Sequence, residues 1–391
     1  MRLIDWYPST LLPTAIFLIT LSAFATSALA FSPAYRSVLK RLSEDIASLT
    51  VFVRKMRNRW NVTVGTLWTL HVIGFFGLGI YLAQILIELG GLVALIDALF
   101  EESYLIRNAE IDQVGIYFSY FGWIAISLTV LRWKLHRRLT VELQLALLLQ
   151  IGGNLLFIDR TRPIWLGLTS VLIVLPFARF VSMWRIAWGA LIVAILGVTV
   201  FVAIAFWVGK TGEGLESYGD VELGLGSLAF YYYMTNGFPY FEELLKITLD
   251  HDYIPQRTLY PLYKLAAILG LASDPPSQIL DFLYAPFPTN VGTFLEPYFS
   301  DGGFLYLAFG IVLATVGVDL LALLFLRAAN PFALYGWANL CFVSFISFFV
   351  PKLVSTPVWL FVLLALASMT LRAALRPIRT PNSSAPIAQR S

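Results

Sequence analysis

The sequence predicts an all-α integral membrane protein with about nine transmembrane helices. Of its 391 residues, 58% are hydrophobic and 13% are charged, which is too apolar for a soluble domain of this length. The apolar residues come in runs of about 20, the length that a helix needs to cross bilayer hydrocarbon with its backbone groups paired. We expect spans at 9–31, 61–87, 115–132, 139–158, 163–180, 185–208, 303–326, 331–350 and 355–371.

The first apolar run resembles the core of a signal peptide, because Ala28-Leu29-Ala30 forms a possible cleavage pattern. The segment that follows, 32–60, holds seven basic residues against two acids. Exporting such a segment would violate the rule that basic residues stay on the cytoplasmic side. We therefore expect an uncleaved first helix.

Basic residues predict the orientation of the other spans. Most of the 27 Lys and Arg lie in 32–60 or follow the third, fifth, seventh and ninth spans, so these segments are expected to be cytoplasmic. This places the N-terminus outside and the C-terminus inside. Because the basic residues separate apolar runs, nucleic acid is not an expected partner. The single cysteine, Cys341, lies in an apolar run and excludes a disulfide framework or a cysteine metal site.

Four regions follow from these patterns. Residues 1–208 hold six spans and a small outer loop at 88–114, which is expected to contain an interfacial helix. The long outer loop 209–302 holds 12 of the 24 acidic residues, and its aromatic content predicts an ordered structure. Residues 303–375 hold the last three spans, and 376–391 has the composition of a disordered tail.

Within the long loop we expect amphipathic helices at about 224–247 and 256–271, lying on or dipping into the membrane surface. This loop and the outer helix ends also hold the candidate functional residues.

Two arginines lie at an outer helix end, where the charge rule disfavours them. Arg160 and Arg162 follow the fourth span. A guanidinium binds diphosphate oxygens through two hydrogen bonds, so these residues are candidates for a diphosphate site. The alternative is an ion pair with Asp159 and ordinary contacts with lipid headgroups.

Polar residues cluster before the seventh span. Glu296 is a candidate general base or an acceptor for sugar hydroxyls, and Asp301 is a second candidate base. Alternatively, Asp301 and Ser300 cap the following helix. The adjacent pair Gly302-Gly303 allows a close turn.

His251 is the only histidine in the predicted outer loops. Asp250 and Asp252 favour its charged form and suit it to relay a proton near neutral pH, although a solvated loop histidine is equally consistent with the pattern. Three adjacent residues rarely converge on one metal, so we expect no metal site here.

An aromatic segment, 230–241, is a candidate glycan-binding region. Aromatic rings and amides suit the apolar faces and hydroxyls of sugars, and Tyr232, Asn236 and Tyr240 are the candidate contacts. The alternative is an aromatic belt at the membrane interface.

The order of these features resembles the oligosaccharide repeat unit polymerases of the Wzy-type O-antigen polymerase family. The resemblance lies in 159–162, 231–241, 257–262, 289–294 and 301–303, and covers about residues 88–320. Two positions depart from the family pattern: Asp159 replaces a serine before Arg160, and Gly302 replaces the usual aromatic residue after Asp301.

The resemblance implies a metal-independent and cofactor-independent enzyme of the bacterial inner membrane, with a site facing the periplasm and a fold similar to the GT-C membrane glycosyltransferases. Its substrates would be oligosaccharides linked to undecaprenyl diphosphate, and its partners membrane lipid and a chain-length regulator protein. The implied diphosphate-binding residues are Arg160, Arg162 and Arg257, with Lys210 and Lys352 as weaker candidates.

The resemblance also assigns the remaining roles. His251, Glu296 or Asp301 would deprotonate the acceptor hydroxyl, and the candidate glycan contacts are Tyr232, Asn236, Tyr240, Asn290 and Thr293. Two other functions remain open: an O-antigen ligase, which transfers glycan to lipid A core, and a polysaccharide or lipid transporter. A transporter would be expected to show internal repeats and buried mid-span charges, and neither is evident in the sequence.

Overall fold

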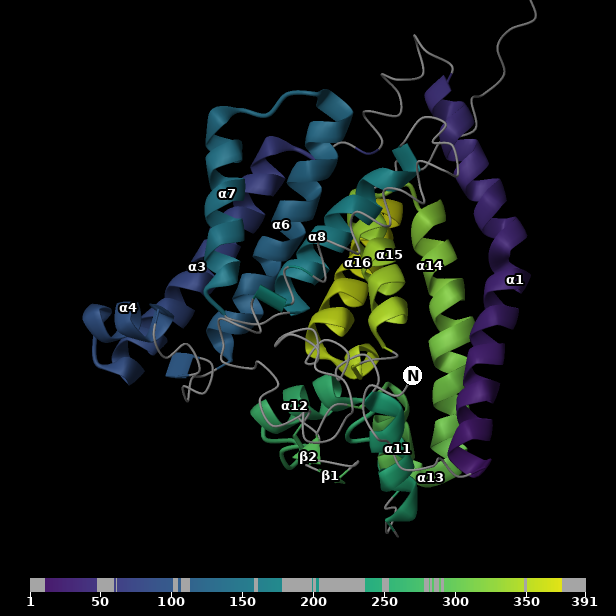
Figure 1. The fold of residues 1–391 in the computed structure, drawn as a ribbon. Coiled ribbons are helices and arrows are strands. Elements are labelled where there is room, and N and C mark those ends of the chain that lie inside the picture. The colour runs from purple at the N-terminus through teal and green to yellow at the C-terminus, as the bar shows by residue number, and fades with distance from the viewer. Residues whose placement is uncertain are drawn as a thin grey trace, which may run out of the picture.

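The chain folds into a bundle of long, mostly apolar helices (Figure 1). The computed structural model describes residues 11–47, 60, 62–100, 105–106, 113–157, 161–177, 199, 202–203, 236–247, 253–277, 281, 283–284, 288–289, 292–347 and 350–374.

Four helical stretches are long and apolar enough to cross a membrane: Leu11–Lys40, Val64–Leu89, Val114–His136 and Leu295–Arg327. They belong to α1 (Leu11–Ala47), α3 (Val64–Leu89), α6 (Val114–His136), and α13 (Leu295–Val312), which continues through the π-helical turn η3 (Leu313–Gly317) into α14 (Val318–Arg327). Shorter apolar helices are α7 (Val141–Leu155), α8 (Thr161–Val174) with η1 (Leu175–Phe177), α15 (Pro331–Ile346) and α16 (Thr356–Ala374). These apolar helices indicate a membrane-embedded, all-α protein.

The predicted spans agree with these helices in part. Every predicted span except 185–208 overlaps one of them, and 185–208 lies outside the described residues apart from 199, 202 and 203. The total of nine spans therefore stays a prediction. The first helix is longer than expected, because α1 continues beyond residue 31, through Pro33, into the basic segment.

Two smaller helices, α11 (Gly237–Lys246) and α12 (Tyr260–Ile268), lie at one end of the bundle, the lower end in Figure 1. α4 (Leu92–Phe100) packs on α3 and lies out to the left of the bundle in Figure 1, and η4 (Lys352–Val354) contacts α15 and α16. The predicted interfacial segments therefore contain helices. α12 is shorter than the predicted 256–271, whereas residues 224–235 of the other predicted helix lie outside the described residues. A two-residue strand β1 (Leu283–Tyr284) pairs antiparallel with β2 (Pro288–Thr289), which the sequence did not predict.

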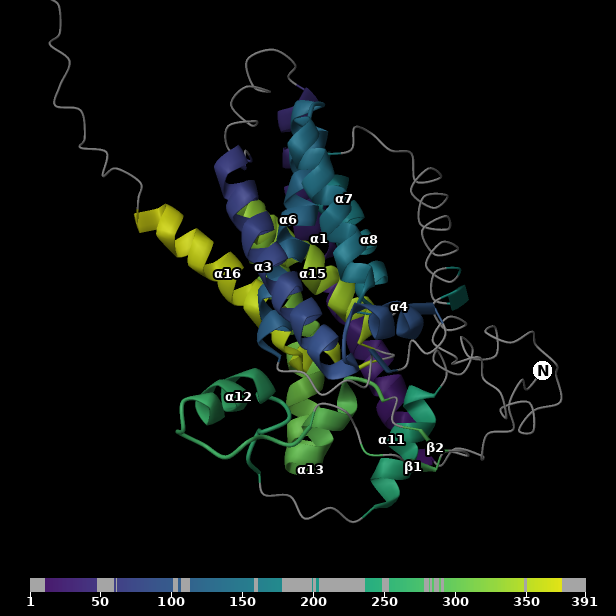
Figure 2. The ribbon, with the colours of Figure 1, turned by 90° about the vertical axis from the view of Figure 1, so that its left-hand side faces the viewer.

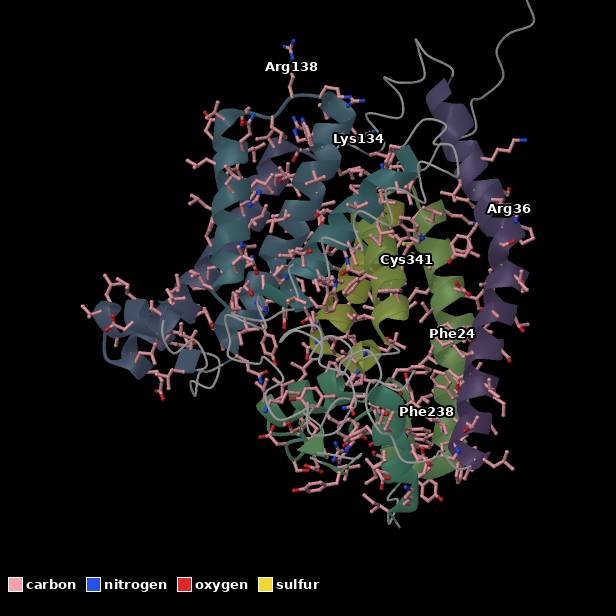
Figure 3. The ribbon with its side chains drawn as sticks, in the orientation of Figure 1. Phe24, Arg36, Lys134, Arg138, Phe238 and Cys341 are labelled. Atoms are coloured by element: carbon pink, nitrogen blue, oxygen red, sulfur yellow. The ribbon has the colours of Figure 1, made fainter. Side chains whose placement is uncertain are left out.

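The two ends of the bundle differ in charge. Lys134 and Arg138 lie at the upper end and Arg36 in the same half, whereas Phe238 of α11 lies in the lower half (Figure 3). Arg327 and Arg372 also lie in the last turns of α14 and α16, which run toward the upper end. This agrees with the predicted gathering of basic residues on one side, and the assignment of that side to the cytoplasm stays a prediction.

Glycine allows α3 and α6 to pack closely. A Cβ atom at Gly77 would lie 2.3 Å from the backbone nitrogen of Ser119. Small residues at such contacts let the backbones of membrane helices approach each other. This contact fixes α6, whose Tyr120 and Trp123 then join the main hydrophobic core with Trp165 and Phe361.

The helix that leads into the seventh predicted span is kinked at Gly302 and Gly303. Gly303 has φ 58° and ψ −146°, a backbone conformation that side chains strongly disfavour. The kink separates the short helical stretch that holds Glu296 and Asp301 from the long apolar stretch that follows. The predicted close turn is therefore present, as a kink within one helix.

Replacing Gly303 with alanine is expected to destabilise the protein by about 1–3 kcal/mol, because the Cβ atom strains this backbone conformation. The measurement is thermal unfolding of the purified protein in detergent. Gly152→Ala is the matched control, because a Cβ atom there meets nothing within 4 Å on a helix. Equal unfolding temperatures for the two variants would contradict the strain at Gly303.

Candidate functional site

A cavity of ≈ 90 Å³ lies where the segment before α12, the start of α13 and the connection between α15 and α16 meet. This volume is several times the ~10–15 Å³ that one water molecule needs. The lining residues are Arg257, Tyr260, Ser277, Pro297, Val350, Pro351, Lys352, Val354 and Ser355. Segments almost 100 residues apart in sequence therefore form one site.

Two cationic side chains line this cavity. Arg257 and Lys352 are both partly buried, and the guanidinium Nη1 of Arg257 donates to the Ser277 carbonyl oxygen at 3.5 Å. Ser277 is exposed, so the cavity reaches the surface beside Arg257. The described residues that line it include no carboxylate. The cavity therefore favours an anion.

Asp301 holds the turn that carries Arg257. Its Oδ1 accepts a hydrogen bond from the backbone N–H of Arg257 at 3.1 Å, and its Oδ2 accepts one from the backbone N–H of Thr258 at 2.7 Å. Asp301 is buried, with 7% of its surface exposed. The helix-capping alternative for Asp301 is wrong, because its carboxylate pairs with a distant turn and not with the start of the apolar stretch that follows the kink.

Glu296 lies one turn earlier on α13 and is fully buried. The hydroxyl of Thr293 donates to its carboxylate, with Oγ1 at 3.1 Å from Oε2 and 3.3 Å from Oε1. The same hydroxyl accepts from the backbone N–H of Leu295 at 3.1 Å. In the part of the chain that the structure describes, no ion pair to Glu296 is present. Thr293 therefore orients a carboxylate beside Pro297, which lines the cavity.

Tyr240 of α11 belongs to the same neighbourhood. Its hydroxyl donates to the carbonyl oxygen of Asp281 at 2.9 Å. Burial raises the pKa of Tyr240, the nearby Glu296 and Asp281 charges raise it further, and Arg257 lowers it. Tyr240 therefore stays protonated at neutral pH, and its phenol is a hydrogen-bond donor.

The predicted glycan contacts are buried where they are described. Asn236, Tyr240 and Thr293 have 0%, 2% and 2% of their surface exposed. None of the three lines the cavity, so their contact with a sugar stays a prediction. Five further candidates lie outside the described residues: Arg160, Lys210, Tyr232, His251 and Asn290.

The structure thus brings Arg257 and Lys352 to one cavity. Asp301 holds the Arg257 turn and Glu296 is next to the lining residue Pro297, but neither carboxylate itself lines the cavity. Tyr260, Ser277 and Pro297 also line the cavity, and the sequence did not predict them as site residues. Lys352 was only a weaker candidate, although a lysine between two outer span ends contradicts the charge rule as Arg160 and Arg162 do. Applying that rule equally to residues 350–355 would have identified this wall of the cavity.

Arg162 of α8 lies among aromatic rings and does not line the cavity. Its guanidinium carbon is 3.6 Å from the ring centroid of Phe157, 5.4 Å from that of Trp123 and 5.9 Å from that of Tyr120. Only 6% of its surface is exposed. Cation–π contacts of this kind are strong when the cation is shielded from water. Arg162 therefore joins α6 to the start of α8, and its contact with diphosphate stays a prediction.

Replacing Arg162 with alanine is expected to lower the unfolding free energy by about 2 kcal/mol, because the aromatic rings lose both the cation and its packing. Thermal unfolding in detergent measures this change. Arg162→Lys should recover part of the stability, since an ammonium also interacts with ring faces. An Arg162→Ala variant with unchanged unfolding and no enzymatic activity would instead favour the diphosphate-binding role.

Comparison with models of protein families, with curated proteins and with solved structures found no match to the chain. The functional argument therefore rests on the residue pattern and on the geometry of this site.

Proposed function

We propose that the protein polymerises oligosaccharide repeat units carried on undecaprenyl diphosphate, transferring the growing glycan to the non-reducing end of an incoming unit. The observation that supports this most is the Arg257 and Lys352 cavity at one end of an apolar helical bundle. A lipid-linked diphosphate needs cationic side chains at headgroup depth and hydrocarbon next to them.

The depth of the cavity agrees with this requirement. The apolar helix from Phe304 to Arg327 is about 36 Å long at ~1.5 Å per residue. Bilayer hydrocarbon is ~30 Å thick. With Arg327 at one interface, Asp301 and the Arg257 turn that it holds lie at the other.

The proposed reaction is a glycosyl transfer. The acceptor hydroxyl oxygen forms a bond with the anomeric carbon of the donor glycan, and the bond from that carbon to the diphosphate oxygen breaks. The leaving diphosphate takes the electron pair, and the hydroxyl proton passes to a base. Arg257 and Lys352 stabilise the negative charge that develops on the diphosphate.

Among the carboxylates, Glu296 is the better candidate base. Each oxygen of Asp301 already accepts a backbone N–H, which leaves Asp301 a structural task. The partners of Glu296 are instead local: the Thr293 hydroxyl donates to it, and the backbone groups of Thr293 and Glu296 also interact with its carboxylate, so it does not hold a distant turn as Asp301 does. Catalytic hydrogen bonds are often completed only in the substrate complex, so burial of Glu296 is compatible with this role. His251 remains the rival base.

Asp301 is a positioning residue in this mechanism. Asp301→Asn replaces one acceptor oxygen with an amide N–H group, which displaces the Arg257 turn. The KM for the lipid-linked glycan donor should then rise ~10-fold, because about one charge-assisted hydrogen bond is lost. In an Arg257→Ala background the same substitution should change KM little, because Asp301 acts through Arg257. Steady-state kinetics of the four proteins measure this coupling. Additive effects would show that Asp301 contributes independently of Arg257.

The function is tested with the purified protein in detergent or vesicles. Incubation with undecaprenyl-diphosphate-linked repeat units should give a ladder of longer lipid-linked glycans on a gel. Supplying lipid A core as the acceptor tests the ligase alternative. Transfer to lipid A core without any ladder would replace the polymerase by the ligase. Movement of lipid-linked glycan across sealed vesicles with no new glycosidic bond would replace both by a transporter.

A further inference from the structure

α12 carries an exposed apolar face. Leu262, Leu265, Ile268 and Leu269 have 46%, 54%, 65% and 63% of their surface exposed. Their spacing of three and four residues places them on one side of the helix. Lys264, on the same helix, forms an ion pair with Asp274 at 2.7 Å. Exposed apolar area of this extent on a short helix indicates a partner.

The face begins at the cavity. Tyr260, the first residue of α12, lines the cavity, and Arg257 lies in the turn immediately before it. From Tyr260 to Leu269 the helix extends about 14 Å at ~1.5 Å per residue. The apolar face therefore leads directly away from the cationic site.

The surroundings of α12 are also apolar. It projects sideways at the lower end of the bundle (Figure 2) and contacts α16. The hydroxyl of Tyr306 on α13 donates to the carbonyl oxygen of Tyr253 at 2.6 Å, which fixes the segment before α12 to that helix. Leu305 and Phe309 of α13 are exposed and belong to an apolar candidate membrane span. The exposed face of α12 is thus close to a surface suited to lipid.

We propose that the apolar face of α12 binds the hydrocarbon chain of the lipid-linked diphosphate while the diphosphate lies between Arg257 and Lys352. This deepens the proposed function and rests on it for the identity of the ligand. An amphiphilic anion fits the site because a cationic cavity and an apolar helical face adjoin at Tyr260. The substrate then reaches the cavity sideways from the bilayer, with its chain along α12.

The test compares the binding of undecaprenyl diphosphate and of inorganic diphosphate to the full-length protein in detergent. Leu262→Ser/Leu265→Ser should weaken binding of undecaprenyl diphosphate by at least ~10-fold, the loss expected for removing apolar contact at two side chains. Its affinity for inorganic diphosphate should stay within about twofold of the original, since the cationic side chains are unchanged. Arg257→Ala should weaken the binding of both ligands.

Leu92→Ser/Val93→Ser is the matched control, because these residues are equally apolar and exposed at 62% and 73% on α4. It should change neither affinity. Photocrosslinking supplies a second measurement that needs no loss of binding. A photoreactive group is attached to the cysteine of Leu265→Cys in a Cys341→Ala background. On illumination it should crosslink to bound undecaprenyl diphosphate, and Arg257→Ala should prevent this crosslink.

The outcomes separate this inference from the proposed function. If inorganic diphosphate binds through Arg257 but the α12 variant leaves both affinities unchanged, the chain lies elsewhere and only this inference is wrong. The inference is also wrong if the group at Leu265→Cys crosslinks to ordinary phospholipid but not to undecaprenyl diphosphate. If the unmodified protein binds neither diphosphate, the diphosphate site itself is wrong and the proposed function loses its main support.

Discussion

Simultaneous replacement of Arg257 and Lys352 with alanine is expected to reduce glycan extension by at least ~10³-fold. Removing one preorganised donor to a developing negative charge typically costs ~10²–10³-fold in turnover. These two side chains are the cations that line the cavity among the described residues. The measurement is the initial rate of chain extension by purified protein with saturating lipid-linked repeat units.

Three further variants define the cause of this loss. Arg257→Lys should recover only a small part of the rate, because an ammonium does not contact two diphosphate oxygens in the planar geometry of a guanidinium. Lys352→Arg should retain most of the activity. Lys246→Ala is the control, since Lys246 is exposed on α11 and pairs with Glu243. A double alanine variant that extends glycan at the original rate would remove the diphosphate site from this cavity.

The helices of the bundle were predictable from the sequence because lipid requires long apolar runs with paired backbone groups. The runs at 61–87 and 115–132 correspond closely to α3 and α6. The length of α1 was not predictable in this way. Its apolar run ends near residue 31, but the helix continues through the polar and basic residues that follow. Hydropathy thus locates a span but not the end of its helix.

The candidate site was predictable only where its contacts are local. Thr293 precedes α13 and Glu296 lies in its first turn, so a separation of three residues lets the hydroxyl reach the carboxylate. Asp301 instead pairs with backbone groups of residues 43 and 44 positions earlier. Local rules offered a helix cap as the alternative role of this aspartate, whereas the packing of a distant turn determines its partners. The same long-range packing brings Lys352 and Arg257 to one cavity, which no spacing in the sequence indicates.

Glu296→Gln is expected to lower the turnover of the polymerase by ~10²–10⁴-fold, the range that a positioned general base contributes. Glutamine has nearly the same shape and still accepts the Thr293 hydroxyl, but it cannot take a proton from a sugar hydroxyl. The affinity for undecaprenyl diphosphate should stay unchanged, because Arg257 and Lys352 are intact. The loss should therefore fall on kcat, in contrast to Asp301→Asn, whose effect should fall on KM.

A second signature comes from the dependence of the rate on pH. A general base acts in its ionised form, so the rate falls as pH decreases, and this acid limb should disappear in Glu296→Gln if Glu296 is the base. Glu243→Gln, at the exposed ion pair on α11, is the control and should keep both rate and profile. If Glu296→Gln keeps its turnover while His251→Ala loses it together with the acid limb, the base is His251. Glu296 is then a buried hydrogen-bond partner that orients the start of α13 through Thr293.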